Sequence, residues 1–134
     1  MKEKHDLRQR LSGMLLEILK SKIHRATVTS ANLEYIGSIT VDASLMERAG
    51  IHENEKVHVL NINNGQRAET YVIKGEPGKR EIVMNGALAR LAQVGDRLII
   101  LSYGFIEEEL ISAHRPEIIV LDEQNHVLET RDHR

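Results

Sequence analysis

The sequence predicts one small, mainly β barrel domain with short helices. Six or more short runs are rich in β-branched side chains and are bounded by Gly, Asn and Pro turn signals, as expected for strands. The helical segments between these runs cover only one or two turns, and none is long enough for a series of βαβ units. At 134 residues and 15.2 kDa, the chain can bury one core but not two.

The expected strands follow one another along the chain. In order, they cover residues 23–30, 35–41, 56–62, 67–74, 81–84, 97–102 and 118–121. Asn63-Asn64-Gly65 lies between two of them and is a strong hairpin signal. Gly75-Glu76-Pro77-Gly78 predicts the turn that follows that hairpin.

Three short helices are expected between the strands. The first begins with the capping-box pattern Ser44-Leu45-Met46-Glu47 and ends at Gly50. The second covers 87–93 and the third covers 106–113, which ends before Pro116. Residues 1–13 are polar and charged and are expected to form an extension, and residues 129–134 a polar tail, which leaves 14–128 as the single domain.

Composition excludes several classes of function. With 18 basic and 20 acidic side chains the net charge is −2, and only three Tyr and one Phe are present, which argues against a nucleic-acid partner. The absence of cysteine excludes disulfides, thiolate metal sites and cysteine nucleophiles. The apolar cluster at 15–19 contains Glu17 and is too short for a membrane span or signal segment. We therefore expect a soluble, cytoplasmic protein without a membrane partner.

Three familiar motifs are incomplete or absent. The segment 75–80 lacks the spacing and the Ser or Thr of a phosphate-binding loop, and it lies between strands. The seven histidines include no pair four residues apart and no His-x-His, so no metal site is predicted. No Gly-x-Ser-x-Gly occurs, so serine hydrolase chemistry has no support.

A Gly-Ser pair inside the apolar run Tyr35-Ile36-Gly37-Ser38-Ile39 is unusual. Alone, such a pair is more typical of a bulge or a bend. Its neighbours are K-x-H-R at 22–25, N-G-x-R-x-x-T-Y at 64–71 and N-G-A at 85–87. In this order and at these intervals, the motifs resemble those of the pyruvoyl-dependent aspartate alpha-decarboxylases. The resemblance extends from about Met14 to about Val127.

The resemblance implies the fold, activity and assembly of that family. It implies a six-stranded double-psi β-barrel, cleaved by its own chemistry between Gly37 and Ser38 and assembled as a homotetramer with active sites between subunits. The implied reaction is conversion of L-aspartate to β-alanine and CO₂ for pantothenate and coenzyme A biosynthesis. The implied cofactor is a pyruvoyl group derived from Ser38, with no metal.

The resemblance also implies roles for individual residues. Ser38 would become the pyruvoyl group that forms a Schiff base with the substrate, and Tyr71 would be the proton donor. The positions that match substrate-binding residues are Lys22, Arg67, Thr70, Gly86, Ala87 and Leu88. Cleavage would involve Gly37, Ser38 and Thr70, with supporting positions at His24, Tyr35 and Asn85. Leu88 departs from the smaller Ala that is usual in the family, which bears on the shape of the pocket.

The residue types suit this chemistry. Loss of the α-carboxylate of an amino acid leaves a carbanion, which needs an electron sink on nitrogen. A ketone supplies that sink. Formation of the ketone would begin when the Ser38 hydroxyl attacks the Gly37 carbonyl, and a glycine at position 37 helps because it tolerates strained backbone angles. Arg67 and Lys22 offer two cations for the two carboxylates of aspartate. A tyrosine hydroxyl is protonated at neutral pH and can deliver a proton.

Two other functions remain open on the sequence. A non-catalytic β-barrel binding module would keep the fold and leave the Gly37–Ser38 bond intact. The same chemistry would also suit another small acidic amino acid, since one methylene is worth only about 1–3 kcal/mol in discrimination. Spontaneous cleavage and cleavage assisted by a maturation protein are equally compatible with these residues.

Overall fold

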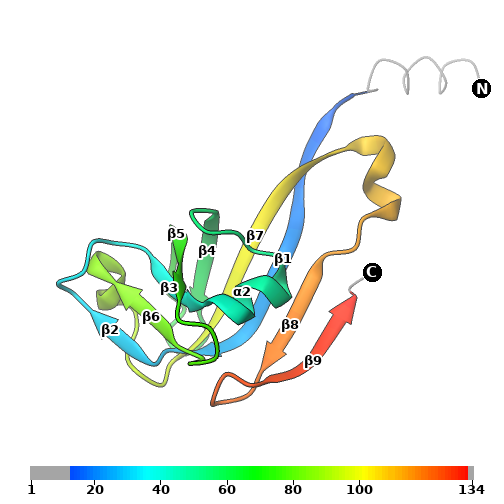
Figure 1. Ribbon diagram of the computed structural model, residues 1–134. Helices are drawn as coiled ribbons and strands as arrows, with labels where there is room; N and C mark the ends of the chain where they lie inside the picture. The colour runs from blue at the N-terminus through cyan, green and yellow to red at the C-terminus, as the bar shows by residue number, and fades with distance from the viewer. Residues whose placement is uncertain (1–12, 133–134) are drawn as a thin grey trace, which may run out of the picture.

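The computed structural model describes residues 13–132 as a mainly β fold with three short helices (Figure 1). The strands in these residues are β1 (Leu15–Thr27), β2 (Ser30–Asn32), β3 (Ile39–Asp42), β4 (Lys56–Asn61), β5 (Arg67–Gly75), β6 (Ile82–Asn85), β7 (Arg97–Glu107), β8 (Glu117–Leu121) and β9 (Val127–Asp132). The helices are α2 (Ala43–Ala49) and two 3₁₀ helices, η1 (Gly86–Leu91) and η2 (Glu108–Ala113). Within residues 13–132, no helix is long and apolar enough to cross a membrane.

The strands form one mixed sheet in the order β2-β6-β3-β5-β4-β7-β1-β8-β9. Three neighbouring pairs are parallel, namely β1 with β8, β2 with β6, and β3 with β5. The two longest strands, β1 and β7, pair antiparallel along almost their whole length and extend away from the other strands, with η2 near the far end of β7 (Figure 1).

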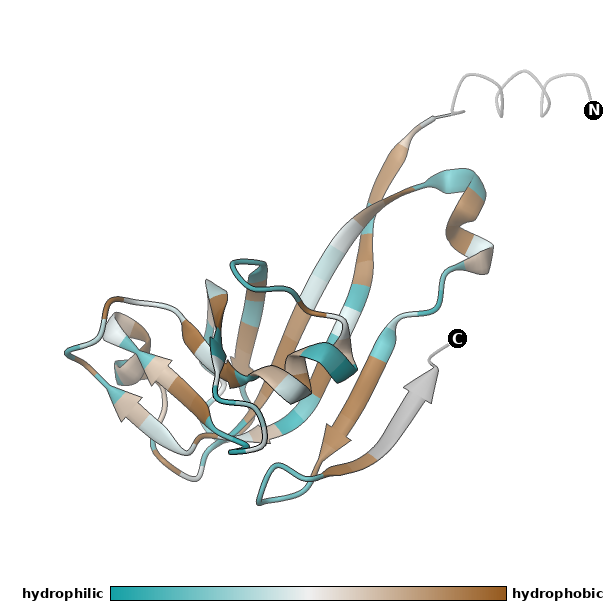
Figure 2. Cartoon of the chain, in the orientation of Figure 1, coloured by the Kyte–Doolittle hydropathy of each residue, from teal (hydrophilic) through white to brown (hydrophobic). Residues whose placement is uncertain are grey.

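The core lies on the inner side of the sheet and is closed by α2, which buries Leu45, Met46 and Ala49. The largest fully buried side chains are Ile23, Ile39, Met46, Ile82, Met84, Leu98, Ile100, Ile119 and Leu121. Hydrophobic residues make up most of β8 and much of β7 (Figure 2), and Leu98, Ile100 and Ile119 on these strands are fully buried. Burial of aliphatic side chains from both halves of the chain therefore holds the sheet in its curved arrangement.

The described residues form a nine-stranded sheet, which agrees with the six or more strands expected from the sequence patterns but does not confirm the six-stranded barrel that the resemblance implies. The strand expected at 23–30 begins at Leu15, since the segment before Ile23 pairs with the end of β7. β7 itself continues to Glu107, beyond the expected end at 102. Residues 129–132 were expected in a polar tail but continue β9, which pairs with β8. Of the expected extension at 1–13, only Gly13 lies in the described part of the chain.

Two local predictions also differ from the structure. The run at 35–41 is extended only from Ile39, because Gly37 and Ser38 both have positive φ and turn the chain before β3. The α2 helix is capped by Asp42 and not by Ser44, because the Asp42 carboxylate accepts a hydrogen bond from the Ser44 backbone N–H at 2.8 Å. Its end at Gly50, in the left-handed conformation, is as predicted.

Candidate active site

The predicted cleavage bond lies at a strained bend immediately before β3. Gly37 has a φ of 47° and Ser38 a φ of 76°, and Ser38 is only 1% exposed. A serine in the left-handed region persists only where its surroundings hold it there, at a cost of about 1–3 kcal/mol. The Gly37–Ser38 peptide bond therefore lies in the kind of backbone geometry that bond rearrangement would relieve.

Asn85 holds Ser38 from the neighbouring strand. β6 pairs antiparallel with β3, with Met84 opposite Ile39, and this pairing brings Asn85 beside Ser38. The Asn85 backbone N–H donates to the Ser38 carbonyl oxygen at 3.1 Å. The side-chain Nδ2 of Asn85 donates to Ser38 Oγ at 3.4 Å, and Asn85 is 2% exposed. The nucleophile of the predicted cleavage is therefore buried and has a defined hydrogen-bond partner.

Gly86 makes the closest approach to the bend. A Cβ atom at this position would lie 2.7 Å from the Gly37 nitrogen and 2.9 Å from the Tyr35 carbonyl oxygen. The φ of Gly86 is also positive, at 58°. Only glycine meets both conditions without displacing its neighbours. The main chain of Tyr35, Gly37 and Gly86 is thus brought together at the bend.

Tyr71 approaches the bend from the other side. β5 pairs parallel with β3, with Val72 opposite Ile39, so Tyr71 lies at the level where the chain enters β3. Its hydroxyl is 4.0 Å from the point where a Cβ atom on Gly37 would lie, and the residue is 40% exposed. Thr70 precedes it on β5 and is half-buried. The phenol is thus both adjacent to the predicted cleavage site and open to small molecules.

Lys22 and Arg67 lie far apart within one chain. On the outer face, cross-strand pairs run from Glu69 on β5 to His58 on β4, then to Leu101 on β7 and Lys22 on β1. Three strand spacings separate β5 from β1, which is about 14 Å along the sheet. Arg67 shares the exposed side of β5 with Glu69. The two cations predicted to hold the substrate are on the same face but are not brought together by this chain.

His24 follows the same pattern as Lys22. It lies on β1 in the row that passes through Ile99 and Leu60 to Arg67. The predicted site residues therefore fall mainly into two groups, one at the bend, which includes the buried Ser38 and Asn85, and one on the outer face of β1. The group at the bend contains Tyr35, Gly37, Ser38, Thr70, Tyr71, Asn85 and Gly86, and the group on β1 contains Lys22 and His24.

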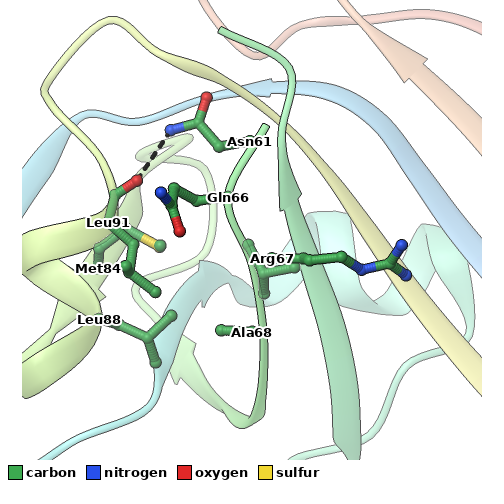
Figure 3. Close-up of a pocket in the computed structure, with 8 residues that line it drawn as sticks. Asn61, Gln66, Arg67, Ala68, Met84, Leu88 and Leu91 are labelled. Atoms are coloured by element: carbon green, nitrogen blue, oxygen red, sulfur yellow. Dashed lines mark hydrogen bonds between the residues drawn. The ribbon is translucent and has the colours of Figure 1, made fainter. Parts of the chain in front are cut away.

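Arg67 lies at the margin of a small pocket beside β5 and η1 (Figure 3). Its guanidinium points away from the apolar part of that pocket, where Met84, Leu88 and Leu91 gather (Figure 3). Leu88 is 9% exposed and belongs to the core, whereas Ala87 before it is exposed. The larger side chain at position 88 therefore fills interior space, and Ala87 is the η1 side chain open to solvent next to Gly86.

The sequence motifs missed two features of this surface. Glu69, between Arg67 and Tyr71 on the exposed side of β5, pairs with Lys56 at 3.4 Å and with His58 at 3.2 Å. Thr40, two residues after Ser38, accepts a hydrogen bond from Asn85 at 2.9 Å. The two-residue spacing in a strand would place Thr40 on the side of Ser38, but the contact with Asn85 depends on the pairing of distant strands. In residues 13–132, no group of three or more His, Asp or Glu side chains could hold a metal ion.

The family model for aspartate decarboxylase matches residues 14–128. The chain belongs to the aspartate decarboxylase family. Its relatives include the aspartate 1-decarboxylase of Caldicellulosiruptor saccharolyticus, which is 61% identical over 86% of this chain and 90% of the relative. The aspartate 1-decarboxylase of Caldicellulosiruptor bescii is 58% identical over 89% and 93%, and that of Listeria monocytogenes is 54% identical over 85% and 90%.

These aspartate decarboxylases are matched along nearly their whole length, so the family assignment covers both groups of site residues. Among solved structures, a computationally designed protein is similar to 65% of this chain, with 19% sequence identity and a TM-score of 0.41. That likeness is too weak to define the topology of the strands.

Proposed function

We propose that this member of the aspartate decarboxylase family converts L-aspartate to β-alanine and CO₂, the reaction that supplies β-alanine for pantothenate and coenzyme A. The observation that carries the proposal is the buried, strained Gly37–Ser38 bond with the Tyr71 hydroxyl beside it, in a chain 53–61% identical to aspartate 1-decarboxylases. A non-catalytic barrel would have no need of a serine held at positive φ, so this geometry favours the enzyme over the binding module.

The chain makes its own catalytic group. The Ser38 hydroxyl oxygen bonds to the Gly37 carbonyl carbon, the Gly37–Ser38 C–N bond breaks, and the hydroxyl proton ends on the freed nitrogen. Removal of the Ser38 Cα proton then expels the Gly37 carboxylate from Cβ and leaves a dehydroalanine. Addition of water and loss of ammonia convert this residue to a pyruvoyl group. The burial of Ser38 and its contact with Asn85 support this role, because both restrict the hydroxyl to a few positions.

Thr70 assists this cleavage by donating its hydroxyl to the Gly37 carbonyl oxygen as charge develops there. Its place on β5, directly before Tyr71 and beside the bend, supports the assignment. Every atom that is transferred in the cleavage comes from residues 37 and 38 and from water.

The residues fit a pyruvoyl group at position 38, because a Cβ atom on Gly37 would meet no atom closer than the Tyr71 hydroxyl at 4.0 Å and Asn85 supplies a hydrogen-bond donor. When present, the pyruvoyl group supplies the electron sink for loss of the α-carboxylate. The Tyr71 hydroxyl delivers a proton to the carbon that has lost CO₂. Gly86, Ala87 and Leu88 border the substrate through their backbone, and the Tyr35 carbonyl oxygen lies beside Gly86 at the bend.

Two chains form each substrate site. Lys22 and His24 on β1 lie about 14 Å along the sheet from Arg67 and Tyr71 on β5. This distance is too long for one aspartate to span, because only two carbon atoms separate its two carboxylates. A second copy that covers the outer face would bring its Lys22 and His24 to the bend of the first. The half-buried Leu60, Leu101 and Tyr103 between the two groups suit such an interface. The assembly is a cytoplasmic homotetramer of double-psi β-barrels.

Production of β-alanine from L-aspartate tests this proposal. Purified protein should convert L-aspartate to equimolar β-alanine and CO₂, and Ser38→Ala should abolish both cleavage and turnover because it removes the attacking hydroxyl. Glutamate offered at the same concentration distinguishes the aspartate enzyme from one for a longer acidic amino acid. Cleaved protein that makes no β-alanine would overturn the assigned substrate.

A further inference from the structure

Three polar side chains meet at the junction of β3 and β6. Ser38 precedes β3, Thr40 lies within it, and Asn85 ends β6. The Asn85 Nδ2 atom lies 2.9 Å from Thr40 Oγ1 and 3.4 Å from Ser38 Oγ. Ser38 and Asn85 are almost fully buried and Thr40 is half-buried, so water has little access to replace either contact.

The two hydrogen bonds from the Asn85 amide differ in strength. The bond to Thr40 has the length of a good N–H···O hydrogen bond, whereas the bond to Ser38 is near the upper limit. The long bond is therefore sensitive to small rotations of the amide. The short bond to Thr40 prevents such rotations, since it fixes the same nitrogen atom.

The side chain of Thr40 packs against the neighbouring strand β5. Its Cγ2 methyl group packs over Gly75 on β5, where a Cβ atom on Gly75 would lie 3.1 Å from it. A β-branched side chain has few rotamers in a strand, and this packing selects among them. The Thr40 hydroxyl is thus presented to Asn85 by contacts with the neighbouring strand on its other side.

We propose that Thr40 is a positioning residue for the cleavage between Gly37 and Ser38. It acts through Asn85: the Thr40 hydroxyl orients the Asn85 amide, and the amide keeps the Ser38 hydroxyl oxygen within reach of the Gly37 carbonyl carbon. This role rests on the proposed function and extends it to a residue that the family motifs do not include. It concerns formation of the catalytic group, and turnover by chains already cleaved does not require it.

Thr40→Val tests this role because valine keeps the shape of threonine and removes the hydroxyl. We expect cleavage, followed by intact mass at fixed temperature, to slow by about 10- to 100-fold, the effect of displacing a reacting atom by up to 1 Å. Thr40→Ser keeps the hydroxyl and should cleave within about threefold of the parent rate, since it loses only the rotamer restriction.

Thr29→Val is the matched control. The Thr29 hydroxyl also bonds to β6, donating to the Ile82 carbonyl oxygen at 3.1 Å and accepting from the Ile82 N–H at 2.9 Å, but it has no bond to Asn85. Thr29→Val should therefore lower the midpoint of unfolding but leave the cleavage rate near that of the parent. If Thr40→Val does not fold, Thr40→Ala takes its place, because it removes the hydroxyl without adding volume.

Each outcome decides the proposal. Slow cleavage in Thr40→Val with near-parent rates in Thr40→Ser and Thr29→Val supports it. A parent rate in Thr40→Val, or equal slowing in all three variants, overturns the role of Thr40 and leaves the proposed function intact. A parent chain that never cleaves overturns the proposed function itself, and with it this inference.

Discussion

Replacement of Gly86 by alanine should both slow chain cleavage and destabilise the fold. Two costs can be worked out from the structure. The φ of 58° costs a residue with a side chain about 1–2 kcal/mol. The new Cβ would also lie 2.7 Å from the Gly37 nitrogen and 2.9 Å from the Tyr35 oxygen, which adds about 1–3 kcal/mol of overlap. The sum is about 2–5 kcal/mol in the free energy of unfolding.

The overlap can be relieved only by moving backbone, because both close contacts are main-chain atoms. Gly37 would have to move by up to about 1 Å, and a shift of this size should slow cleavage by about 100-fold. Gly78→Ala is the control, because Gly78 also has a positive φ, of 87°, but has no atom within 4 Å of its Cβ position. It should lose about 1–2 kcal/mol and cleave normally. Intact mass with time and urea unfolding measure both effects, and equal cleavage in the two variants would refute the reasoning.

Three further predictions concern turnover, substrate binding and stability. Tyr71→Phe should still be cleaved but should make β-alanine about 10²–10⁴-fold more slowly, and a parent rate in a β-alanine assay would exclude Tyr71 as the proton donor. Lys22→Ala should raise the KM for aspartate but should leave chain cleavage and the tetramer unchanged. Light scattering should give a tetramer mass near 61 kDa, from four chains of 15.2 kDa. A fully active monomer would contradict a site shared between two chains. Burial alone would raise the pKa of Asp42, but hydrogen bonds from Ser44, Arg80 and Gly78 leave it below the ordinary value of 3.8. Its stabilisation is therefore present above pH 3.8 and is lost as the pH falls through the lower folded pKa. In thermal melts between pH 5 and pH 2, Asp42→Asn should lose less stability than the parent protein. An equal loss of stability in both proteins would exclude Asp42 as the source of the acid sensitivity.

Local patterns predicted the parts of the fold that depend on local interactions. The hairpin of β4 and β5 follows the expected ranges closely, because Asn64-Gly65 fixes the turn and β-branched residues flank it. The end of α2 follows from Gly50, which adopts the left-handed conformation. The early start of β1 could not be predicted this way, since the segment before Ile23 becomes a strand by pairing with β7, about 80–90 residues further along the chain.

In the candidate site, too, the sequence predicted only the features that have local signals. The order of the motifs led to Gly37, Tyr71 and Gly86 as candidate site residues, and in the structure these residues lie close to one another. The bond between Thr40 and Asn85 has no local signal, because it exists only where β3 and β6 pair. The separation of Lys22 from Arg67 could not be predicted from the sequence either, because it depends on the two strands, β7 and β4, that lie between β1 and β5 in the sheet.

Intact mass of the purified protein tests the central claim most directly. Cleavage between Gly37 and Ser38 should give fragments of 37 and 97 residues, about 4.2 and 11.0 kDa at the mean residue mass of a 15.2-kDa chain of 134 residues. The larger fragment should lack a free amino terminus and be lighter by one ammonia than the same fragment beginning with serine. A full-length chain that persists after prolonged incubation, with or without a maturation protein, would contradict the account.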